Sequence, residues 1–359
     1  MTKTPLYKQI YQSIKDKIIS GELRPKDRVP SEQEFMDEFM VSKITVKNAL
    51  AALVDEGLVT RIQGKGTFVA AVPASSGINP LPLANQTAPS SAKSYIGLII
   101  PTMKTKVIQR LVDYIEYYVK EAGYQLILHI TRESSSEESR SVQELIGTPG
   151  VCGIIVFPTE DERYNESLLR LSLDKYPFVF IDRYLRNIET YRITSDNWGG
   201  AYQTVSWLLQ KGHERIALVS PDNTNTSIED RTHGFEKAFI DNNIPIDKSL
   251  WCHVPIAILR NGGTSAYVES FLQQQSNMTA VFALTAEMTR LTHHALQQEQ
   301  GLNSQIELVS FDDPEIPGIS HILQDEEQMA HSAVQLLLDQ LEGYYVPQRV
   351  EIPVKWMEV

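Results

Sequence analysis

The chain has 359 residues, of which 42% are hydrophobic and 22% charged, so it resembles an ordinary globular protein with room for two or three domains. The formal net charge is -12, and the sequence holds two cysteines, which excludes a disulfide framework or a zinc cluster built from cysteines alone. No run of about 18 apolar residues could cross a bilayer, so we expect a cytoplasmic protein without a membrane segment.

The net charge is divided unevenly along the chain. Residues 1–70 hold 11 Lys and Arg against 9 Asp and Glu, a net charge of +2, whereas the remaining residues carry -14. A polyanion would be repelled by the acidic part but not by the first 70 residues. The two parts are therefore predicted to meet different partners.

The first two predicted elements are helices. Apolar residues at helical spacing predict a helix over residues 6–19, which Gly21 closes. Ser31 and Glu34 have the spacing of a capping box, so a second helix is predicted to begin after Ser31.

A third helix and a hairpin complete this part of the chain. Ser42 is predicted to cap a helix that stops at Gly57. Residues 58–70 read as two short strands around a glycine-rich turn. Three helices followed by a hairpin predict a winged helix-turn-helix domain over residues 1–70.

The start of the third helix carries the side chains expected to meet double-stranded DNA. In a helix-turn-helix the N-terminal residues of the second helix of the motif enter the major groove. The polar residues at this position are Ser42, Lys43, Thr45, Lys47 and Asn48. Arg61 and Lys65 on the predicted hairpin could reach phosphate or the minor groove.

The segment "GELRPKDRVPSEQEFMDEFMVSKITVKNAL", followed by "GKGTFV", resembles the DNA-binding head of GntR-family regulators. The resemblance implies further DNA contacts from Ser31, Gln33 and Gly66. Gln33 stands where that family usually has Arg, and Lys43 and Lys47 stand at its two recognition-helix arginines. Because Lys acts as a point charge and cannot fork onto guanine as Arg does, we expect Thr45 and Asn48 to read more of the base sequence.

Residues 71–93 are predicted to form a linker. They contain four prolines, four serines and no acidic residue, with few large apolar side chains to offset the entropy of ordering.

The body, residues 94–359, alternates strands and helices. The strand candidates are residues 95–100, 125–130, 153–157, 178–181, 192–194, 215–220, 250–254, 280–283 and 306–311. The helix candidates are residues 106–122, 198–210, 232–242, 264–275, 286–299 and 326–342. This alternation predicts a two-lobed α/β body with parallel sheets, in which a ligand binds at the carboxyl ends of the strands. The expected fold is therefore multidomain, a winged helix-turn-helix followed by this body.

Four motifs in the body resemble the sensor core of LacI/GalR repressors, which is similar to periplasmic sugar-binding proteins. They are S-D-N-x-x-G at 195–200, K-G-H-x-x-I-A at 211–217, R-x-x-G-F at 231–235 and F-D-D at 311–313. The resemblance implies sugar contacts from Asp182, Arg231 and Asp312, and from Thr285 in place of the usual amide. Carboxylates and a guanidinium suit sugar hydroxyls, which both donate and accept hydrogen bonds. The alternative for Arg231 and Asp312 is a structural ion pair between the lobes.

Other residues are candidates for the same site. Phe157, Tyr184 or Trp198 could stack on a sugar ring. Asp196 and Asn197 are expected to act as hinge or capping residues. If Lys104, Arg183 and Arg231 converge, the effector could instead be a phosphorylated or other non-sugar metabolite acting as a corepressor.

Catalytic readings find little support. The histidines share no metal-ligand spacing, and no nucleophile or phosphate-loop motif appears. GntR-type heads are also fused to aminotransferase-like bodies that bind pyridoxal phosphate, but those bodies are longer, and Lys104, Lys106, Lys211 and Lys355 lack the setting of a Schiff-base lysine. We expect no enzyme activity, no cofactor and no metal.

These observations predict a transcriptional repressor of sugar catabolism. Two heads would bind a two-fold operator, with the bodies dimerising through helices such as the one that starts near Lys106. A small sugar, such as L-arabinose or a related monosaccharide, would close the lobes and release the DNA.

Overall fold

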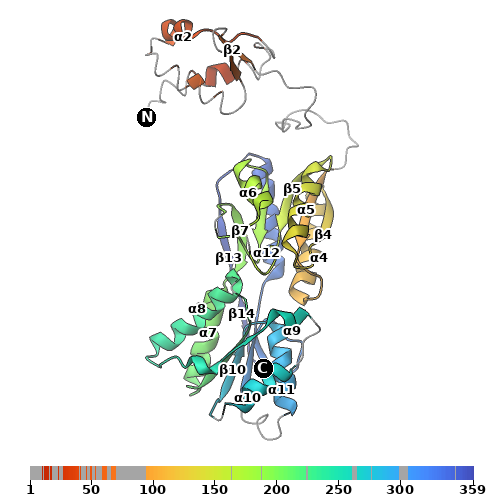
Figure 1. The fold of residues 1–359 in the computed structure, drawn as a ribbon, viewed down its shortest axis with the longest axis vertical. Coiled ribbons are helices and arrows are strands. Elements are labelled where there is room, and N and C mark those ends of the chain that lie inside the picture. Colours follow the sequence, from red (N-terminus) through yellow and green to blue (C-terminus); the bar gives the residue numbers. More distant parts are fainter. Residues whose placement is uncertain are drawn as a thin grey trace. The chain divides into compact units, whose positions relative to one another are not determined.

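The computed structural model describes two parts of the chain. It describes residues 94–359 apart from 163, 187, 224, 261–264, 276, 299–305 and 344, and also residues 10, 12–15, 17, 23, 27–39, 41, 46, 49–50, 53, 59–62 and 66–69. The chain divides into two compact units, Met1–Asn85 and Gln86–Val359 (Figure 1). The predicted linker, residues 71–93, lies outside the described residues.

The N-terminal unit contains the predicted second helix, α2 (Glu32–Phe39), and the predicted hairpin. The capping box is formed in both directions, since the Ser31 N–H donates to Glu34 Oε2 (2.6 Å) and the Glu34 N–H donates to Ser31 Oγ (3.3 Å). Strands β1 (Val59–Ile62) and β2 (Gly66–Val69) pair antiparallel. The apolar stripes of the predicted first and third helices meet in one core, formed by residues that include Ile10, Ile14, Phe35, Val46, Leu50 and Leu53.

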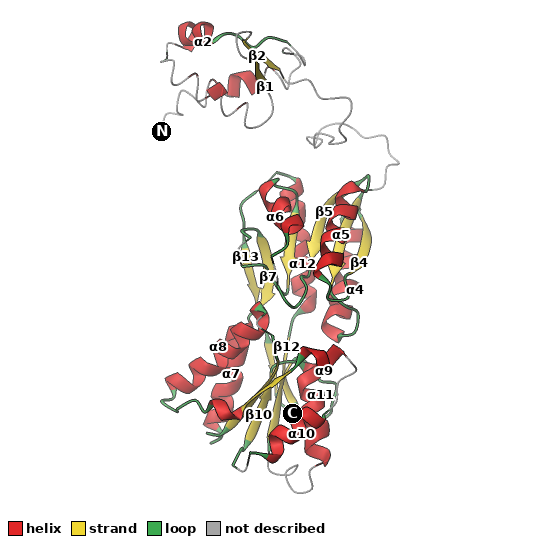
Figure 2. Cartoon of the chain, in the orientation of Figure 1, coloured by secondary structure: helices red, strands yellow, loops and turns green. Residues whose placement is uncertain are grey.

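The first lobe of the body is built on a parallel sheet with the strand order β13-β7-β6-β5-β3-β4 among the described residues. Its strands are β3 (Tyr95–Ile100), β4 (Gln125–Ile130), β5 (Val151–Val156), β6 (Phe178–Ile181), β7 (Tyr191–Ser195) and β13 (Arg349–Ile352). Helices α4 (Lys106–Glu121) and α12 (Glu326–Leu341) cover one face, and α5 (Ser135–Gly147) and α6 (Glu166–Leu173) cover the other. Figure 2 shows these layers.

The second lobe repeats this plan with the strand order β14-β12-β11-β10-β8-β9, in which only β14 runs antiparallel to its neighbour among the described strands. Its strands are β8 (Ile216–Pro221), β9 (Trp251–Val254), β10 (Ala280–Ala283), β11 (Glu307–Phe311), β12 (Ser320–Leu323) and β14 (Lys355–Met357). Its helices are α7 (Asn197–Gln210), α8 (Thr226–Asp241), α9 (Ile256–Arg260), α10 (Ala266–Gln273) and α11 (Ala286–Gln298), with a 3-10 turn at Lys248–Leu250.

The chain crosses between the lobes at three connections, which follow β7, β12 and β13. The first passes through Asp196, the second through Gln324 and Asp325, and the third through Pro353 and Val354. Each lobe is therefore assembled from distant parts of the sequence, and any movement between lobes must occur around these three segments.

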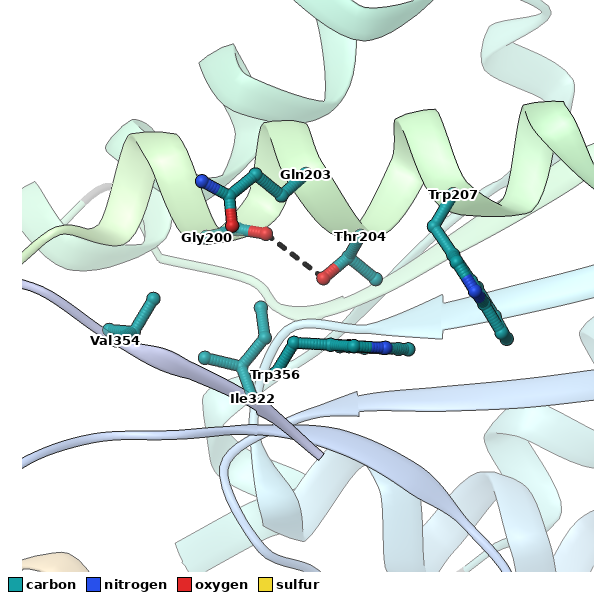
Figure 3. Close-up of a pocket in the computed structure, with 7 residues that line it drawn as sticks. All are labelled: Gly200, Gln203, Thr204, Trp207, Ile322, Val354 and Trp356. Carbon is teal, nitrogen blue, oxygen red and sulfur yellow. Dashed lines mark hydrogen bonds between the residues drawn. The ribbon is translucent and has the colours of Figure 1, made fainter. Parts of the chain in front are cut away.

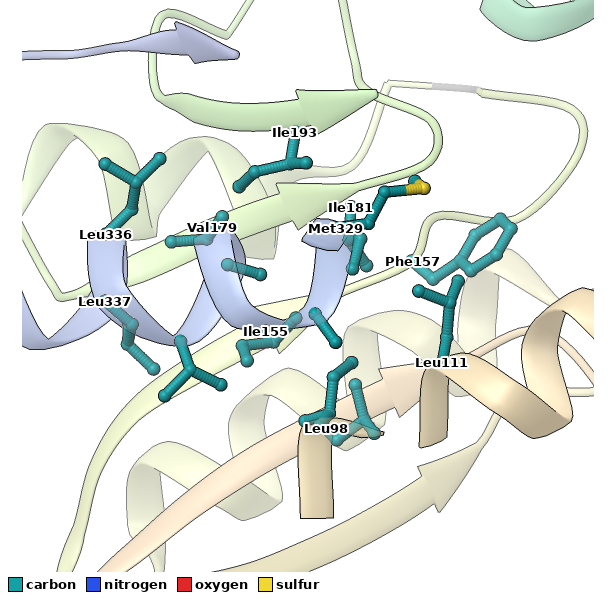
Figure 4. Close-up of a cluster of buried hydrophobic side chains, with 14 of the residues drawn as sticks. Leu98, Leu111, Ile155, Phe157, Val179, Ile181, Ile193, Met329, Leu336 and Leu337 are labelled. Atoms are coloured by element: carbon teal, nitrogen blue, oxygen red, sulfur yellow. The ribbon is translucent and has the colours of Figure 1, made fainter. Parts of the chain in front are cut away.

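The central strands of both sheets, such as β3, β6, β8 and β10, are buried on both faces, as is usual for parallel sheets, whereas the edge strands β4, β13 and β14 are partly exposed. In the first lobe, residues such as Leu98, Ile155 and Val179 pack against α4 and α12, with Met329 and Leu337 contributed by α12 (Figure 4). No helix in the described part of the chain is long and apolar enough to cross a membrane.

The two-lobed α/β prediction is confirmed, but several elements differ from their predicted bounds. Helix α8 begins at Thr226 rather than Thr232, because Asn225 caps a polar first turn that has no apolar periodicity. Helices α5, α6 and α9 and strands β12, β13 and β14 were not predicted. Helix α5 could not be predicted from apolar periodicity, because it is largely polar and buries Glu138 and Ser141 beside its apolar residues.

Candidate functional site

Two aspartates occupy corresponding positions in the two lobes. Asp182 follows β6 and Asp312 follows β11, the equivalent strands of the two sheets. Both have a left-handed backbone, with φ of 67° and 73°. The Asp182 N–H donates to the Ile193 carbonyl (2.8 Å), and the Asp312 N–H donates to the Ile322 carbonyl (3.0 Å). Aspartate tolerates this conformation better than most residues, and such strain gathers at binding sites.

Arg231 is the centre of the polar network. It projects from α8 and is 4% exposed. Its Nε donates to Asn197 Oδ1 (2.8 Å), and its Nη1 donates to the Leu284 carbonyl (2.6 Å) and lies 3.5 Å from Asp312 Oδ2. The guanidinium also stacks over the Phe311 ring at 3.6 Å from the centroid. These contacts fix the orientation of the guanidinium before any ligand arrives.

The close packing of α7 on α8 makes the Asn197–Arg231 contact possible. A Cβ added at Gly234 would lie 2.3 Å from the Trp198 carbonyl oxygen, so only glycine fits at this approach of the two helices. The glycine of the R-x-x-G-F motif therefore holds the helix that carries Arg231 against the helix that carries Asn197. Asp196 is the N-cap of α7, as predicted, and accepts from the Gly199 N–H (2.8 Å).

Two polar residues at the interlobe connections extend the network. Gln324, which follows β12, donates from Nε2 to Asp312 Oδ1 (2.6 Å). Ser195, at the end of β7, donates from Oγ to Gln324 Oε1 (2.5 Å). Neither residue was predicted, although each is a polar side chain at the carboxyl end of a strand, where ligand contacts gather. The network thus joins Arg231 to two of the three interlobe connections.

Arg183 brings a second cation to the site from the first lobe. Its Nε lies 4.0 Å from Asp182 Oδ2, and its Nη1 lies 3.7 Å from Glu133 Oε1. Burial raises the pKa of Asp182, while the nearby Arg183 and Arg231 oppose that rise. Burial also lowers the pKa of Arg231, which Asp312 counteracts. The site is therefore a desolvated group of paired opposite charges, in which hydrogen bonds are stronger than in water.

Arg231 and Asp312 both belong to the second lobe, so the suggested ion pair between lobes is wrong as a description of this contact. The pair lies within one lobe and faces Asp182 of the other. The structure brings Asp182, Arg231 and Asp312 close together, since each of the other two influences the pKa of Asp182, and their contact with a sugar stays a prediction.

The remaining predicted contacts are more dispersed. Thr285 Oγ1 accepts from the Met288 N–H (3.2 Å) at the start of α11. Phe157 lies in the core of the first lobe (Figure 4). The Arg183 guanidinium lies 5.0 Å from the centroid of its ring. Trp198 is 43% exposed and stacks on Tyr202, outside the Arg231 network. Lys104 is exposed on the loop after β3 and interacts electrostatically with Glu287 of α11 in the other lobe.

A separate pocket of 130 Å³ lies in the second lobe. It is lined by Gly200, Gln203, Thr204, Trp207, Ile322, Val354 and Trp356 (Figure 3). The lining is mainly apolar, and the Thr204 hydroxyl is already engaged in donating to the Gly200 carbonyl (2.9 Å). None of these residues belongs to the Arg231 network. A second, smaller pocket of about 10 Å³ lies between the lobes, in the interlobe cleft, and Asp312 and Gln324 line it together with residues of α4. Across the described residues, no group of three or more His, Cys, Asp or Glu could hold a metal ion.

The predicted DNA contacts are only partly within the described residues. Ser31 forms the capping box and Gln33 lies in α2. Arg61 lies in β1 opposite Thr67, and Gly66 begins β2. Six further predicted contacts lie outside the described residues, namely Ser42, Lys43, Thr45, Lys47, Asn48 and Lys65.

Comparison with known families agrees with both units. Residues 6–69 match the model of the bacterial regulatory proteins of the gntR family, and residues 205–358 match a periplasmic binding protein-like domain.

Comparison with individual proteins covers nearly the whole chain. The chain is 26% identical over 360 residues to an arabinose metabolism transcriptional repressor of Geobacillus stearothermophilus, covering 94% of this chain and 92% of that protein. It is 30% identical over 244 residues to the arabinose metabolism transcriptional repressor of Halalkalibacterium halodurans, covering 67% of this chain and 62% of that protein. A putative ribose operon repressor from Burkholderia thailandensis has the same fold, with a TM-score of 0.65 at 22% identity over 75% of this chain and all of that chain.

Proposed function

We propose that this chain, a GntR-type DNA-binding head joined to a LacI-like body, is a repressor of carbohydrate-catabolism genes that a small sugar releases from its operator. The observation that carries the proposal is the buried Arg231–Asp312 pair of the second lobe, which lies close enough to Asp182 of the first lobe to influence its pKa. In this assignment residues 1–70 bind DNA, residues 71–93 connect, and residues 94–359 bind the effector and dimerise.

The chemistry of the cleft suits an uncharged, hydroxyl-rich ligand. Carboxylates of Asp182 and Asp312 accept hydrogen bonds from sugar hydroxyls, while Arg231 and Gln324 donate to them. Because relatives of similar length are named as arabinose metabolism repressors, L-arabinose is the first effector to test. Phe157, Trp198, Thr285 and Lys104 are secondary candidates for contact with it.

Release from DNA follows from closure of the lobes around the sugar. Closure moves the lobes about the three connections, and in a dimer this changes the distance between the two heads. The coupling is reciprocal, so the operator must weaken sugar binding by the same factor. The head binds DNA through Ser31, Gln33, Ser42, Lys43, Thr45, Lys47, Asn48, Arg61, Lys65 and Gly66. The proposed chain performs no catalysis and acts in the cytoplasm.

A gel-shift experiment tests the whole proposal. The full chain is titrated against DNA from upstream of its neighbouring genes, with and without L-arabinose and a panel of other monosaccharides. One sugar should release the DNA. If saturating sugar leaves operator affinity unchanged or raises it, the induction mechanism is wrong and a corepressor mechanism replaces it.

The second candidate is a phosphorylated metabolite acting as a corepressor. It is favoured by the approach of Arg183 and Arg231 to the same carboxylate, that of Asp182. Titration calorimetry separates the two candidates. Heat with sugar phosphates and none with free sugars would support the second candidate.

The head can be tested with Lys47→Ala. A lysine that neutralises one phosphate should, when removed, weaken binding to all DNA sequences similarly and reduce the slope of log K against log salt by about one charge. Binding measured at several salt concentrations checks this. A loss of discrimination at one base pair would instead show that Lys47 reads sequence.

A further inference from the structure

Glu162 joins the two lobes through the start of α8. It lies in the loop after β5 of the first lobe, and its Oε1 accepts from the Thr226 N–H (2.6 Å) and the Thr226 Oγ1–H (2.7 Å) in the second lobe. Thr226 is the first residue of α8 and is almost fully buried. Glu162 itself has a left-handed φ of 41°, a conformation that costs energy for glutamate.

Other contacts join the first lobe to the same part of the second. Ser227 Oγ donates to the Asp182 carbonyl (3.1 Å), and Arg186 pairs with Glu229 of α8. Nearby, Glu160 of the same loop pairs with Arg260 of α9 (2.6 Å). The first turn of α8 is therefore held by the first lobe.

The contact also determines where negative charge sits in the cleft. The N-terminus of a helix attracts anions, because unpaired N–H groups and the helix dipole both favour negative charge. Here the chain supplies that anion itself. The two cleft arginines are likewise beside carboxylates, Arg231 with Asp312 and Arg183 with Asp182 and Glu133. A phosphate entering the cleft would have to displace one of these internal carboxylates.

We propose that Glu162 is a specificity-determining latch, whose carboxylate occupies the α8 N-terminus in place of an anionic ligand group and holds the lobes together. The cleft then admits uncharged hydroxyl-bearing effectors and excludes phosphorylated ones. This inference rests on the cleft being the effector site of the proposed function, and it names the class of effector that the site selects.

The test measures the distance between the lobes without sugar or DNA. Labels are placed at Asp174→Cys in the first lobe and Glu214→Cys in the second, with Cys152 and Cys252 replaced by serine or alanine. Glu162→Ala and the milder Glu162→Gln should shift the distance distribution to longer values, while Asn225 still caps α8 and preserves the fold. The matched control is Glu166→Gln, because Glu166 is exposed and pairs with Arg170 within the first lobe.

Inorganic phosphate is the second probe. It should shorten the interlobe distance in Glu162→Ala by occupying the vacated helix N-terminus, and sodium chloride of equal ionic strength should not. Wild type should not respond to phosphate. Unchanged distances in both Glu162 variants, or an equal phosphate response in wild type, would overturn the proposal. Failure of L-arabinose to bind would count against the proposed function alone, since no sugar enters this measurement.

Discussion

At the scale of single residues, Arg231 is placed to contribute both to the fold and to the proposed ligand site. Arg231→Lys keeps a positive charge beside Asp312 but removes the planar group that reaches Asn197 and Leu284 while stacking on Phe311. A hydrogen bond to a charged group is worth about 1.5–3 kcal/mol, so the affinity for the sugar of the proposed function should fall by at least about tenfold. Titration calorimetry measures this loss. If Arg231→Lys melts earlier but binds sugar normally, the role of Arg231 is structural.

Glu138 allows a prediction about pH. It is 1% exposed, and its two oxygens accept from the Thr159 N–H (2.9 Å) and from Asn165 Nδ2 (2.7 Å). Burial raises the pKa of Glu138 above its ordinary value of 4.5. A carboxyl whose pKa is raised by folding contributes stability that is complete below the unfolded pKa and is lost as pH rises through the folded pKa.

Glu138→Gln tests this sign. Glutamine does not titrate, so the unfolding free energy of the Glu138→Gln variant should lack that pH dependence. The new amide group must also point its N–H groups at another donor, either the Thr159 N–H or Asn165 Nδ2, which should lower the unfolding free energy by about 1–3 kcal/mol. Denaturant unfolding of both chains between about pH 4.5 and 8 measures the difference in unfolding free energy. The advantage of wild type should shrink as pH rises. A constant difference over this range would contradict the assignment.

Some residues of the candidate site can be recognised from their local sequence, whereas others depend on partners that are distant in the sequence. Asp182 and Asp312 could be predicted because each follows a recognisable buried strand, and Arg231 because it stands in a motif with Gly234. Gln324 was missed because β12, the strand that it follows, was not predicted, and Glu162 could not be predicted because its partner Thr226 lies in the other lobe. No local periodicity records such long-range contacts, and they become visible only when the sheets are assembled.

At the scale of elements, the contact between α7 and α8 depends on Gly234. Gly234→Ala would place a Cβ against the Trp198 carbonyl, which belongs to the backbone and cannot rotate away. The helices must separate, at a cost of about 1–3 kcal/mol for overpacking, and Asn197 should lose its contact with Arg231. Thermal melting and sugar titration should both show a loss.

The matched control for this substitution is Gly147→Ala. Gly147 ends α5 and has open space where a Cβ would be added. That variant should melt near the wild-type temperature and bind sugar normally. An equal effect of both substitutions would mean that the loss comes from glycine replacement in general and not from the α7–α8 contact.

Elements with apolar periodicity could be predicted from the sequence. Elements that depend on a capping residue, or on pairing with a strand far away in the sequence, could not. Central strands such as β3, β5, β6 and β10 are nearly continuous apolar runs, because parallel strands inside a sheet are covered on both faces. The start of α8 depends instead on the Asn225 cap and on Glu162 from the other lobe. Strands β13 and β14 are short and join edges of different lobes, so their identity depends on partners far away in sequence.

At the scale of the whole molecule, the three interlobe connections link the proposed ligand site to movement between the lobes. Ser195 and Gln324 lie at two of these connections and share a hydrogen bond, and Gln324 also binds Asp312. A ligand that engages Asp312 therefore acts directly on a group that joins the lobes. A ligand shifts a conformational equilibrium only when it binds one conformation more tightly than the other, and contact with a group that joins the lobes provides such a difference.

We predict that the proposed dimer forms through α4 and the edge strand β4 of the first lobe. These adjoining elements leave large apolar side chains in solvent, with Tyr117 54% and Leu128 38% exposed. Exposed apolar groups on an edge strand mark sites of association. The double substitution Tyr117→Glu and Leu128→Glu should therefore convert a dimer of 40.6-kDa chains into a monomer, as measured by light scattering. Operator affinity should fall with the loss of the dimer, because one head then binds one half-site.

Leu173→Glu, at a 70% exposed residue of α6 in the same lobe, is the control and should remain dimeric. A double variant that stays dimeric, or a control that becomes monomeric, would place the interface elsewhere.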